Sequence, residues 1–595
     1  MARRALPLLL LALLGGALVA AGAPDTRSSL FAVEGKALVS TASLPAQASP
    51  AADKRPTTSK RPAAARVSAA RDAARDTVEQ DASRQAGGPV LAEGRLPARF
   101  HAQRRETVLE ALPSDGVAVL FSNPRRTRAG DVRHPYRQDS NLHYLTGAPN
   151  PGSVLMLAPG GIAVGGEEPR EVLFVPPRTA RSQTWKGPRL GPARAERLLG
   201  VEQAVPNGRF AKVVQRVARD STRRFFHLPL PYGIEEDSDL AGQVAAFRGA
   251  ARLMPEASSR LTRRATEAMR TVDRPTAFQT LQRQFRRRLS PDAFQSAFLR
   301  EAYRQFAGSD SLAAWTRWRS ARFGPSRADG QSLERLLAQM RVEKTPAEQR
   351  LMRRVAGITA RAQKAALRTV EPGAHEYAVE AAAEYVFQEN GARAAFPSVV
   401  GSGPNTDVLQ YHTNRRQMQA GELVVVDVGA ERHGYIADVA RTAPVDGSFS
   451  EEERAIYELV LRAQKAAIQA ARPANNFRDP QQATRRVLGE GLVELGLLDD
   501  ANDVGRYFTH PAAHYLGRSV HDAGRGGPLE AGTVLAVEPG LYLPASEDLP
   551  EKWHHVGVRI EDVVLVTEDG PEVLSKSAPR APQAVEALMR EPREL

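Results

Sequence analysis

Residues 423–442 read LVVVDVGAERHGYIADVART, two apolar strand-like runs that each contain one Asp. If the runs form a hairpin centred on Arg432 and His433, Asp427 lies directly opposite Asp438, with β-carbons about 4.5–5.5 Å apart. Two carboxylates this close repel each other unless they share a proton or a cation. The stretch therefore predicts a hairpin that holds a cation. The competing interpretation is one misplaced strand Asp and one exposed Asp.

The C-terminal part of the chain supplies further side chains that can bind a cation. The apolar strand pattern TVLAVE ends on Glu538, and the pattern GVRIEDVVLV places Arg559 and Glu561 two residues apart, hence on one strand face. Of twelve histidines in the chain, three lie within one stretch of twelve residues: His510, His514 and His521. Four carboxylates and one imidazole suit a pair of divalent ions, with manganese the best match and zinc or cobalt as alternatives.

Composition narrows the choice of site and partner. The 595-residue chain has no cysteine, which excludes a disulfide scaffold, a zinc finger, an iron–sulfur cluster and a thiol nucleophile. The net charge of +13 suggests an acidic partner such as nucleic acid, but residues 241–330 alone hold 17 Arg against 7 Asp or Glu. We expect that segment to be a helical insertion with a solvated basic face, and nucleic-acid binding is the weaker interpretation.

The order of these residues resembles that of the pita-bread metallopeptidases, which include Xaa-Pro aminopeptidases, prolidases, methionine aminopeptidases and creatinase. The resemblance rests on four strings: DVGAERHGYIADVARTAPVDGSFSEEE, HPAAHYLGRSVHD, AVEPGLY and GVRIED. Two more strings, HPYRQDSNLHYLTG (134–147) and QTWKGPRLG (183–191), resemble the N-terminal domain of the aminopeptidase P type. Together the similar parts cover roughly residues 96–235 and 331–575. Creatinase-like chemistry is disfavoured, because that branch does not usually need the metal ligands found here.

The resemblance implies a role for each metal ligand. Asp427 would bind one ion, and Asp438 and Glu561 would bridge both ions. His514 and Glu538 would complete the second site. Glu538 would also relay the proton of the attacking water.

Other residues of the pattern would contact or support the substrate. His510 and His521 would line the pocket beside the scissile carbonyl, and Arg559 would orient the bridging carboxylates. The family usually carries His in the position that Gln410 occupies here. Gln donates a hydrogen bond but carries no proton near neutral pH. His412, which we expect on the same strand and the same side, could partly replace that histidine.

The resemblance and the composition together predict the layout of the chain. We expect an α/β N-terminal domain of the aminopeptidase P type and an α+β pita-bread catalytic domain, with a helical Arg-rich insertion between them. The segments are a signal peptide (1–23), a disordered spacer rich in Ala, Ser and Arg (24–95), the N-terminal domain (96–240), the insertion (241–330), the metallopeptidase domain (331–580) and a tail (581–595).

The N-terminus predicts export. Arg3 and Arg4 precede an apolar run that ends near Ala21 and is followed by small residues, the pattern of a secretory signal peptide. We therefore expect a periplasmic or extracellular protein with no stable membrane span after cleavage. An uncleaved signal would instead anchor the protein in the membrane.

Local patterns predict several elements. Arg99–Leu112 is typical of a helix and Gly116–Ser122 of a buried strand, and Asn141–Thr146 also has a strand-like pattern. A helix is expected over Lys344–Arg368, with Thr345 and Glu348 as a capping box.

The function implied by the resemblance is that of a dinuclear-metal aminopeptidase. It would hydrolyse the bond between an N-terminal residue and a following proline, by attack of a metal-bound hydroxide. Its substrates would be peptides with proline at the second position. The alternatives are a prolidase-type dipeptidase and a non-catalytic binding module of the same fold. The family also suggests a homo-oligomer, a dimer or tetramer, with Trp185 near a neighbouring subunit's site.

Overall fold

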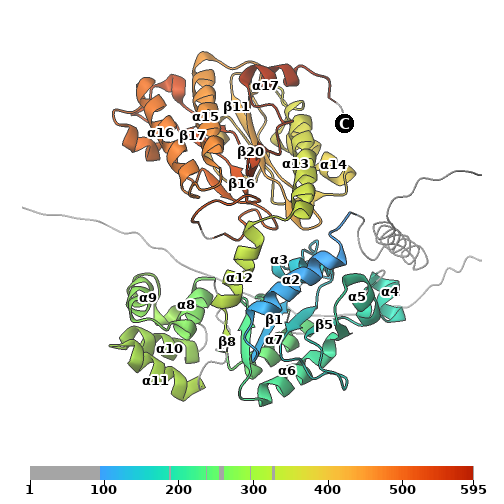
Figure 1. Ribbon diagram of the computed structural model, residues 1–595. Coiled ribbons are helices and arrows are strands. Elements are labelled where there is room, and N and C mark those ends of the chain that lie inside the picture. Colours follow the sequence, from blue (N-terminus) through green and yellow to red (C-terminus); the bar gives the residue numbers. More distant parts are fainter. Residues whose placement is uncertain are drawn as a thin grey trace, which may run out of the picture. The chain divides into compact units, whose positions relative to one another are not determined.

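The structure of the protein is a computed structural model, shown in Figure 1. It describes residues 94–186, 189–235, 238–253, 260–294, 297–323, 328–524 and 526–593. The expected signal peptide and all but the last two residues of the expected spacer lie outside this set. Within the described part of the chain, no helix has both the length and the apolar character needed to cross a bilayer.

A six-stranded sheet organises the N-terminal domain (Figure 1). Its strands, in spatial order, are β6 (Gln203–Pro206), β5 (Glu171–Val175), β4 (Val154–Leu157), β1 (Gly116–Phe121), β7 (Arg224–His227) and β8 (Ala328–Asp329). Within this sheet β4 is antiparallel and the other five strands run in one direction. The carboxyl ends of these five strands therefore meet at one edge of the sheet.

Helices cover both faces of this sheet, because its strands alternate buried side chains between the two faces. One face packs against α2 (Ala98–Ala111), α3 (Ser140–Thr146) and α5 (Gly191–Leu199). The other face packs against α6 (Phe210–Arg219) and α7 (Asp239–Ala250). The predicted α/β class of the N-terminal domain is confirmed.

The prediction of a strand at Asn141–Thr146 is wrong, because this segment is helix α3. The carboxylate of Asp139 caps the helix by accepting hydrogen bonds from the backbone N–H groups of Asn141 and Leu142. Gly147, at φ 67°, ends it in the left-handed conformation. The cap and the terminator decide the structure of a short segment whose apolar residues fit either a helix or a strand.

His101, on α2, is expected to make the protein less stable in acid. Its side chain is 3% exposed, and burial lowers its pKa to about 3. An unfolded His titrates near 6.5, so between these values the unfolded chain binds a proton that the folded chain rejects. Stability should therefore fall as the pH falls below about 6.5, by about 1.4 kcal/mol per pH unit.

Melting temperatures measured between pH 7 and pH 4 check this expectation. In His101→Gln the melting temperature should fall less steeply with acid than in the wild type. The matched control is His134→Gln, at an exposed histidine of the same domain, which should keep the wild-type slope. Equal slopes in all three proteins would contradict the assignment.

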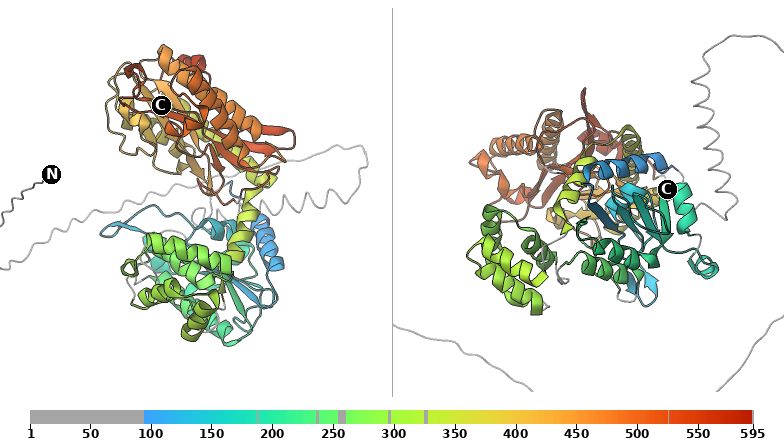
Figure 2. Two further views of the ribbon diagram at one scale, coloured as in Figure 1. Left: turned by 90° about the vertical axis from the view of Figure 1, so that its left-hand side faces the viewer. Right: turned by 60° about the horizontal axis from the view of Figure 1, so that its bottom comes forward.

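Residues 260–323 contain four helices with a core of their own: α8 (Arg260–Thr271), α9 (Pro275–Arg288), α10 (Ala297–Gly308) and α11 (Leu312–Phe323). Phe306 and Trp315 are fully buried in this core, and Trp315 stacks on Trp318. Figure 2 shows the four helices as one bundle. The predicted helical insertion is thus found within the described residues.

The predicted limits of the insertion, 241–330, differ from those of the bundle. Helix α7 packs on the N-terminal sheet, and β8 pairs with β7, so both ends of the predicted segment belong to the N-terminal domain. Composition alone does not separate α7 from the insertion, because its sequence, DLAGQVAAFRGA, is equally rich in small residues.

Short antiparallel sheets form the centre of the C-terminal domain (Figure 1). They comprise β10 (Val399–Ser402), β11 (Leu423–Val428) and β14 (Val439–Pro444); β9 (Arg393–Ala394), β12 (Ala430–Arg432) and β13 (Tyr435–Ile436); β15 (Ala513–Tyr515), β16 (Val534–Val537), β19 (Asp562–Thr567) and β20 (Gly570–Val573); and β17 (Gly540–Leu543) and β18 (Val556–Arg559). Four long helices pack around them: α13 (Pro346–Leu367), α14 (Glu376–Glu389), α15 (Glu451–Ala470) and α16 (Asp479–Glu494). The predicted α+β class is confirmed.

The ends of this domain are fixed by specific contacts. Helix α13 has the predicted capping box: the Thr345 hydroxyl accepts from the Glu348 backbone N–H, and the Glu348 carboxylate accepts from the Thr345 N–H. The segment 581–595, predicted as a tail, contains helix α17 (Pro582–Met589). Val585 and Leu588 of α17 are buried in the main core, so most of this segment is part of the domain.

The hairpin that carries Asp427 and Asp438 forms, but its register differs by two residues from the predicted one. Asp427 pairs with Ala440, so its predicted direct opposition to Asp438 is wrong. A shift of two residues leaves every side chain on its original face of the sheet. The two carboxylates are therefore diagonal neighbours on one face, still within reach of a shared cation.

The turn of the hairpin explains this register. Arg432 pairs with Tyr435, and the two residues between them, His433 and Gly434, have φ of 54° and 76°. A two-residue turn with positive φ at both positions matches the twist of paired strands. Glycine adopts a positive φ without strain. A turn centred one residue earlier would place Arg432 and His433 at these two positions and would leave Gly434 outside the turn.

The tip of this hairpin contacts the N-terminal domain. The Arg137 guanidinium, from the loop before α3, donates to the Glu431 carboxylate on β12 at 3.1 Å. The Arg518 guanidinium donates to Nδ1 of His143 on α3 at 2.5 Å. A β-carbon on Gly434 would lie 2.7 Å from the same His143 atom, so only glycine fits at the tip. The hairpin is thus held at its far end by another domain.

Candidate active site

The five predicted metal ligands come from strands or from residues where strands are interrupted. Asp427 lies on β11 and His514 on β15. Asp438 stands in the gap between β13 and β14, Glu538 directly follows β16, and Glu561 stands between β18 and β19. These strands belong to adjoining sheets of the same domain. They bring together residues that are far apart in the sequence, such as Asp427 and Glu561, which are 134 positions apart.

The strand predicted over Gly557–Val566 is interrupted at Glu561, so the prediction of one continuous strand is wrong. Strand β18 pairs with β17, whereas β19 pairs with β16. Where the chain changes partners, the Glu561 backbone N–H donates to the Ala440 carbonyl of β14 at 3.0 Å. This bond ties Glu561 to the strand that follows Asp438.

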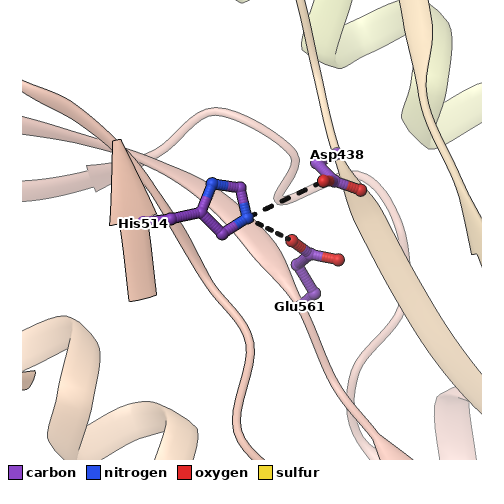
Figure 3. Close-up of side chains that lie close together, drawn as sticks. All are labelled: Asp438, His514 and Glu561. Atoms are coloured by element: carbon purple, nitrogen blue, oxygen red, sulfur yellow. Dashed lines mark ion pairs between the residues drawn. The ribbon is translucent and has the colours of Figure 1, made fainter. Parts of the chain in front are cut away.

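Asp438, His514 and Glu561 point toward one another (Figure 3). Nε2 of His514 lies 3.9 Å from a carboxylate oxygen of Asp438 and 3.9 Å from one of Glu561. An oxygen of Glu538 lies 3.5 Å from the same nitrogen. These separations are long for hydrogen bonds, but they suit ligands that surround a cation at about 2.0–2.2 Å each.

The unsatisfied atoms of the cluster fit divalent metal ions. Three carboxylate oxygens of this cluster are buried without a hydrogen-bond partner among the described residues: Asp427 Oδ1, Asp438 Oδ1 and Glu561 Oε1. Buried oxygens of this kind are costly unless a cation or donor compensates them. Carboxylate oxygen and imidazole nitrogen are ligands that manganese, zinc and cobalt all accept. The donor set therefore matches the predicted metal site.

Crowding and burial change the acidity of these side chains. Burial, followed by the charges of Asp427 and Glu538, raises the pKa of Asp438 well above its usual range. Burial and Asp438 do the same to Glu561. Burial also raises the pKa of Glu538 to about 8 and lowers that of His514 to about 4. Because a metal must displace any protons from these carboxylates, metal affinity should fall as the pH falls.

Arg559 connects Asp427 to two groups that the sequence analysis missed. Its guanidinium donates to Asp427 Oδ2 at 2.6 Å, to the Tyr542 hydroxyl at 2.8 Å and to the Leu409 carbonyl at 3.1 Å. These bonds compensate the buried charge of Asp427 and fix its orientation. Arg559 was predicted to orient the bridging carboxylates, Asp438 and Glu561, but the carboxylate that it contacts is Asp427, the predicted ligand of a single ion. Tyr542 belongs to the string AVEPGLY, four residues after Glu538. Its place in this string is the sequence feature that could have identified it as a site residue.

The two predicted pocket histidines border the ligand cluster. Nδ1 of His510 lies 3.7 Å from Glu538, and its Nε2 lies 2.9 Å from the Tyr542 hydroxyl. Burial lowers the pKa of His510 to about 4, so the ring is neutral near pH 7. The exposed ring of His521 packs edge-on against His514, with centroids 4.7 Å apart. Nδ1 of His510 also lies 2.9 Å from the Pro511 carbonyl, so both nitrogens of this ring have partners. His510 and His521 therefore both lie at the edge of the cluster, where a bound substrate could meet them.

Gln410 and His412 are placed differently from the prediction. Neither residue is on a strand: Gln410 lies in a turn, and both side chains are exposed. The expected same-strand, same-side arrangement is therefore wrong. The carbonyl of the preceding residue, Leu409, accepts a hydrogen bond from the Arg559 side chain rather than from a neighbouring strand. Gln410 is thus next to a residue that contacts the site.

Comparison with protein families assigns both domains. The family described as "Metallopeptidase family M24" matches residues 350–568, which include all five predicted metal ligands. The family described as "Aminopeptidase P, N-terminal domain" matches residues 101–226. The helix bundle α8–α11 lies between the two matches.

Individual relatives match most of the chain. The Xaa-Pro aminopeptidase of Escherichia coli is 30% identical over 82% of this chain and 96% of its own length. That of Haemophilus influenzae is 29% identical over 83% of this chain and 98% of its own. The solved structure of aminopeptidase PepP of Pseudomonas aeruginosa has a TM-score of 0.66, is 30% identical, and is covered over 98% of its length. A variant of Escherichia coli aminopeptidase P in complex with substrate has a TM-score of 0.65 at 27% identity.

The fold, the ligand cluster and these matches agree on one family. Both of its domains are present, in the same order, and similarity extends over nearly the whole length of the bacterial relatives. The chain belongs to the Xaa-Pro aminopeptidases of the pita-bread metallopeptidase family.

Proposed function

We propose that this protein is a metal-dependent aminopeptidase that hydrolyses the bond between an N-terminal residue and a following proline. The observation that carries the proposal is the set of unpartnered, buried carboxylate oxygens around His514. The names of the relatives, Xaa-Pro aminopeptidases, supply the substrate class. In a non-catalytic binding module without metal, these buried carboxylates would destabilise the fold and nothing would compensate their charge.

The bound ions would be held by Asp427, Asp438, His514, Glu538 and Glu561. We infer two ions, with manganese the first choice and zinc or cobalt as alternatives. Such ions supply Lewis acidity and lower the pKa of a bound water toward neutrality. Metal analysis of the purified protein tests the number: two equivalents support the dinuclear site, and one equivalent rejects it.

The remaining site residues would transfer a proton, contact the substrate or hold other site residues in place. The Glu538 carboxylate would accept a proton from the attacking water and pass it to the leaving proline nitrogen. His510 and His521 would contact the scissile carbonyl and the charge that develops on its oxygen. Arg559 and Tyr542 touch no reacting atom and would hold Asp427 and His510 in place.

Assays on peptides of two lengths test the proposal. With manganese added, the purified protein should release a free amino acid from Xaa-Pro-Xaa tripeptides but not from Xaa-Ala-Xaa tripeptides. Comparison with the matching Xaa-Pro dipeptide separates the aminopeptidase from a prolidase-type enzyme. No release from any Xaa-Pro peptide would reject the function altogether.

Gln410→His is expected to raise kcat/KM on an Xaa-Pro-Xaa peptide about tenfold or more, since proton transfer by a positioned His contributes this much or more in other enzymes. The gain should follow protonation of the new imidazole and add a limb to the pH profile near its usual pKa of about 6.5. The control is His412→Gln, which removes the neighbouring imidazole. A loss of activity there, without a gain in Gln410→His, would assign the role to His412.

Location and assembly are further proposals. The apolar N-terminal run supports export to the periplasm or the extracellular space, which fractionation and N-terminal sequencing of the mature protein would test. In a dimer or tetramer, Trp185 would lie near a neighbouring subunit's site, as the resemblance of its string QTWKGPRLG implies; its side chain, on α4 (Ala180–Lys186), is 79% exposed and accessible for such a contact. A monomeric mass in solution would reject this assembly.

A further inference from the structure

The loops at the carboxyl edge of the N-terminal sheet form a groove that the peptidase function does not use. A cavity of about 450 Å³ lies beside the ends of β1 and β7. A second cavity, of about 280 Å³, shares Asn123 and Pro124 with the first. A third, of about 60 Å³, shares Arg125 and Arg189 with the second. We call the three together the carboxyl-edge groove, and all its lining residues belong to the N-terminal domain.

The two ends of the groove differ in polarity. The first cavity is lined by apolar and aromatic side chains, among them Phe121, Leu228, Leu230 and Tyr232, and by four prolines. Its three charged side chains are bonded to the protein: Arg126 donates to the Tyr232 and Gly233 carbonyls, Arg137 donates to Glu431, and Asp139 caps α3. Tyr232 is 52% exposed although it borders a cavity. The second and third cavities are lined by three arginines: Arg125, Arg133 and Arg189. An elongated molecule in the groove would therefore meet apolar surface at one end and positive charge at the other.

Two of these arginines form no ion pair among the described residues, although the nearby Glu235 carboxylate attracts Arg125. Arg133 forms an ion pair with Glu235 at 2.6 Å. Arg125 and Arg189 form no hydrogen bond and no ion pair within the residues that the structure describes. Burial, followed by the charges of Arg189 and Arg133, lowers the pKa of Arg125. Guanidinium groups held near one another without a counter-ion are stabilised by an anion that bridges them.

The other polar groups of the groove leave room for this anion. The Glu235 carboxylate forms an ion pair with Arg133, and the Asp239 carboxylate accepts a hydrogen bond from Asn207. Asn150 lines the third cavity, and its side-chain oxygen is buried without a partner in the described part of the chain. A half-turn of this amide exchanges its oxygen and nitrogen, so it can also present an N–H donor.

We propose that the carboxyl-edge groove binds a small amphiphilic anion, in which an apolar body carries a carboxylate or a phosphate. The apolar body would occupy the first cavity, and the anionic group would lie between Arg125 and Arg189. The position fits a general rule, because open sheets of parallel strands bind ligands at the carboxyl ends of those strands. Cavities of roughly 300–1,000 Å³ with mostly apolar linings and a few polar groups are typical of small-molecule sites.

Calorimetric titration of the full-length, metal-loaded protein tests the proposal with four probes: octanoate, octyl phosphate, octanol and inorganic phosphate. Octanoate or octyl phosphate should bind at least tenfold more tightly than octanol and inorganic phosphate. The comparison between the first two identifies the anionic group. If octanol binds as well as both anions, the arginines play no part, and if inorganic phosphate does, the apolar cavity plays none; either result overturns the proposal.

Variants locate the site. Arg125→Gln/Arg189→Gln should weaken binding of the better anion at least tenfold, and the charge-conserving Arg125→Lys/Arg189→Lys should recover part of it. The control Arg128→Gln, at an exposed arginine of the same loop, should bind like the wild type. All variants should keep wild-type kcat/KM on the tripeptide, which excludes misfolding. Unchanged affinity in the Gln variant, or competitive inhibition of hydrolysis with the same affinity in all proteins, places the anion elsewhere and rejects the groove.

Discussion

Asp438→Asn should lower kcat/KM on an Xaa-Pro-Xaa peptide by about a thousandfold or more and should remove bound divalent metal. The Asp438 carboxylate lies 3.9 Å from His514 Nε2, and one of its oxygens is buried without a partner. Asparagine preserves the shape of the side chain but contributes no charge to the site. Metal catalysis supplies several kcal/mol of transition-state stabilisation, and each 1.4 kcal/mol is a factor of ten in rate.

The same substitution should have the opposite effect on the stability of the metal-free protein. Without metal, burial and neighbouring carboxylates raise the pKa of Asp438, so its charged form is unfavourable in the folded state. Removing that charge should raise the melting temperature measured in chelator at pH 8. Added manganese should then stabilise the wild type but not the variant.

A matched control separates this effect from a general response to charge. Asp499→Asn removes one carboxylate from an exposed position and should leave both the activity and the melting temperatures unchanged. If Asp438→Asn retained two bound ions and wild-type activity, the assignment of this cluster as the metal site would be wrong.

Arg559→Met should destabilise the folded protein by about 3–5 kcal/mol, the usual cost of removing one partner of a buried ion pair. The Asp427 carboxylate would lose its 2.6 Å ion pair, and the Tyr542 hydroxyl and the Leu409 carbonyl would each lose a donor. Methionine fills a similar volume, so the loss should come from charge and hydrogen bonding rather than from a cavity. Thermal melting of the metal-loaded protein measures it.

Arg559→Lys provides the informative comparison. Lysine keeps the positive charge but cannot donate to three acceptors in the planar arrangement of a guanidinium. It should recover part of the stability but little of kcat, because Asp427 and His510 would no longer be held in one orientation. Full recovery of kcat in the lysine variant would show that charge alone matters here. The exposed Arg462→Lys serves as the control.

The four carboxylate ligands could be predicted from the sequence because each stands in a strand pattern where a carboxylate is otherwise unfavourable. The choice of His514 among three nearby histidines depends on the family resemblance. Asp427 inside LVVVDV and Glu538 at the end of TVLAVE need no tertiary information to be recognised as exceptions. The register of the hairpin did need such information. The register depends on the positive φ of His433 and Gly434. From the sequence alone, a turn centred on Arg432 and His433 and a turn at His433 and Gly434 are both compatible with this glycine.

The error at α3 has a local origin, because the Asp139 cap, which outweighs the strand-like pattern, binds N–H groups only two and three residues further on. The remaining errors come from contacts that are distant along the chain. The role of Tyr542 depends on its meeting Arg559 and His510 from a different strand. The domain to which α7 or α17 belongs is decided by the hydrophobic core that buries its apolar residues. The composition of a short, alanine-rich helix does not show which core that is.

The contacts at the hairpin tip give the N-terminal domain a mechanical part in the site. The hairpin carries Asp427 and Asp438 at its base, and near its tip Glu431 accepts hydrogen bonds from Arg137 while Gly434 lies close to His143. A displacement of the N-terminal domain would therefore act on the hairpin at the end opposite to the two aspartates. Substitution of Arg137 in the N-terminal domain is therefore a way to perturb the metal hairpin without changing any residue of the catalytic domain.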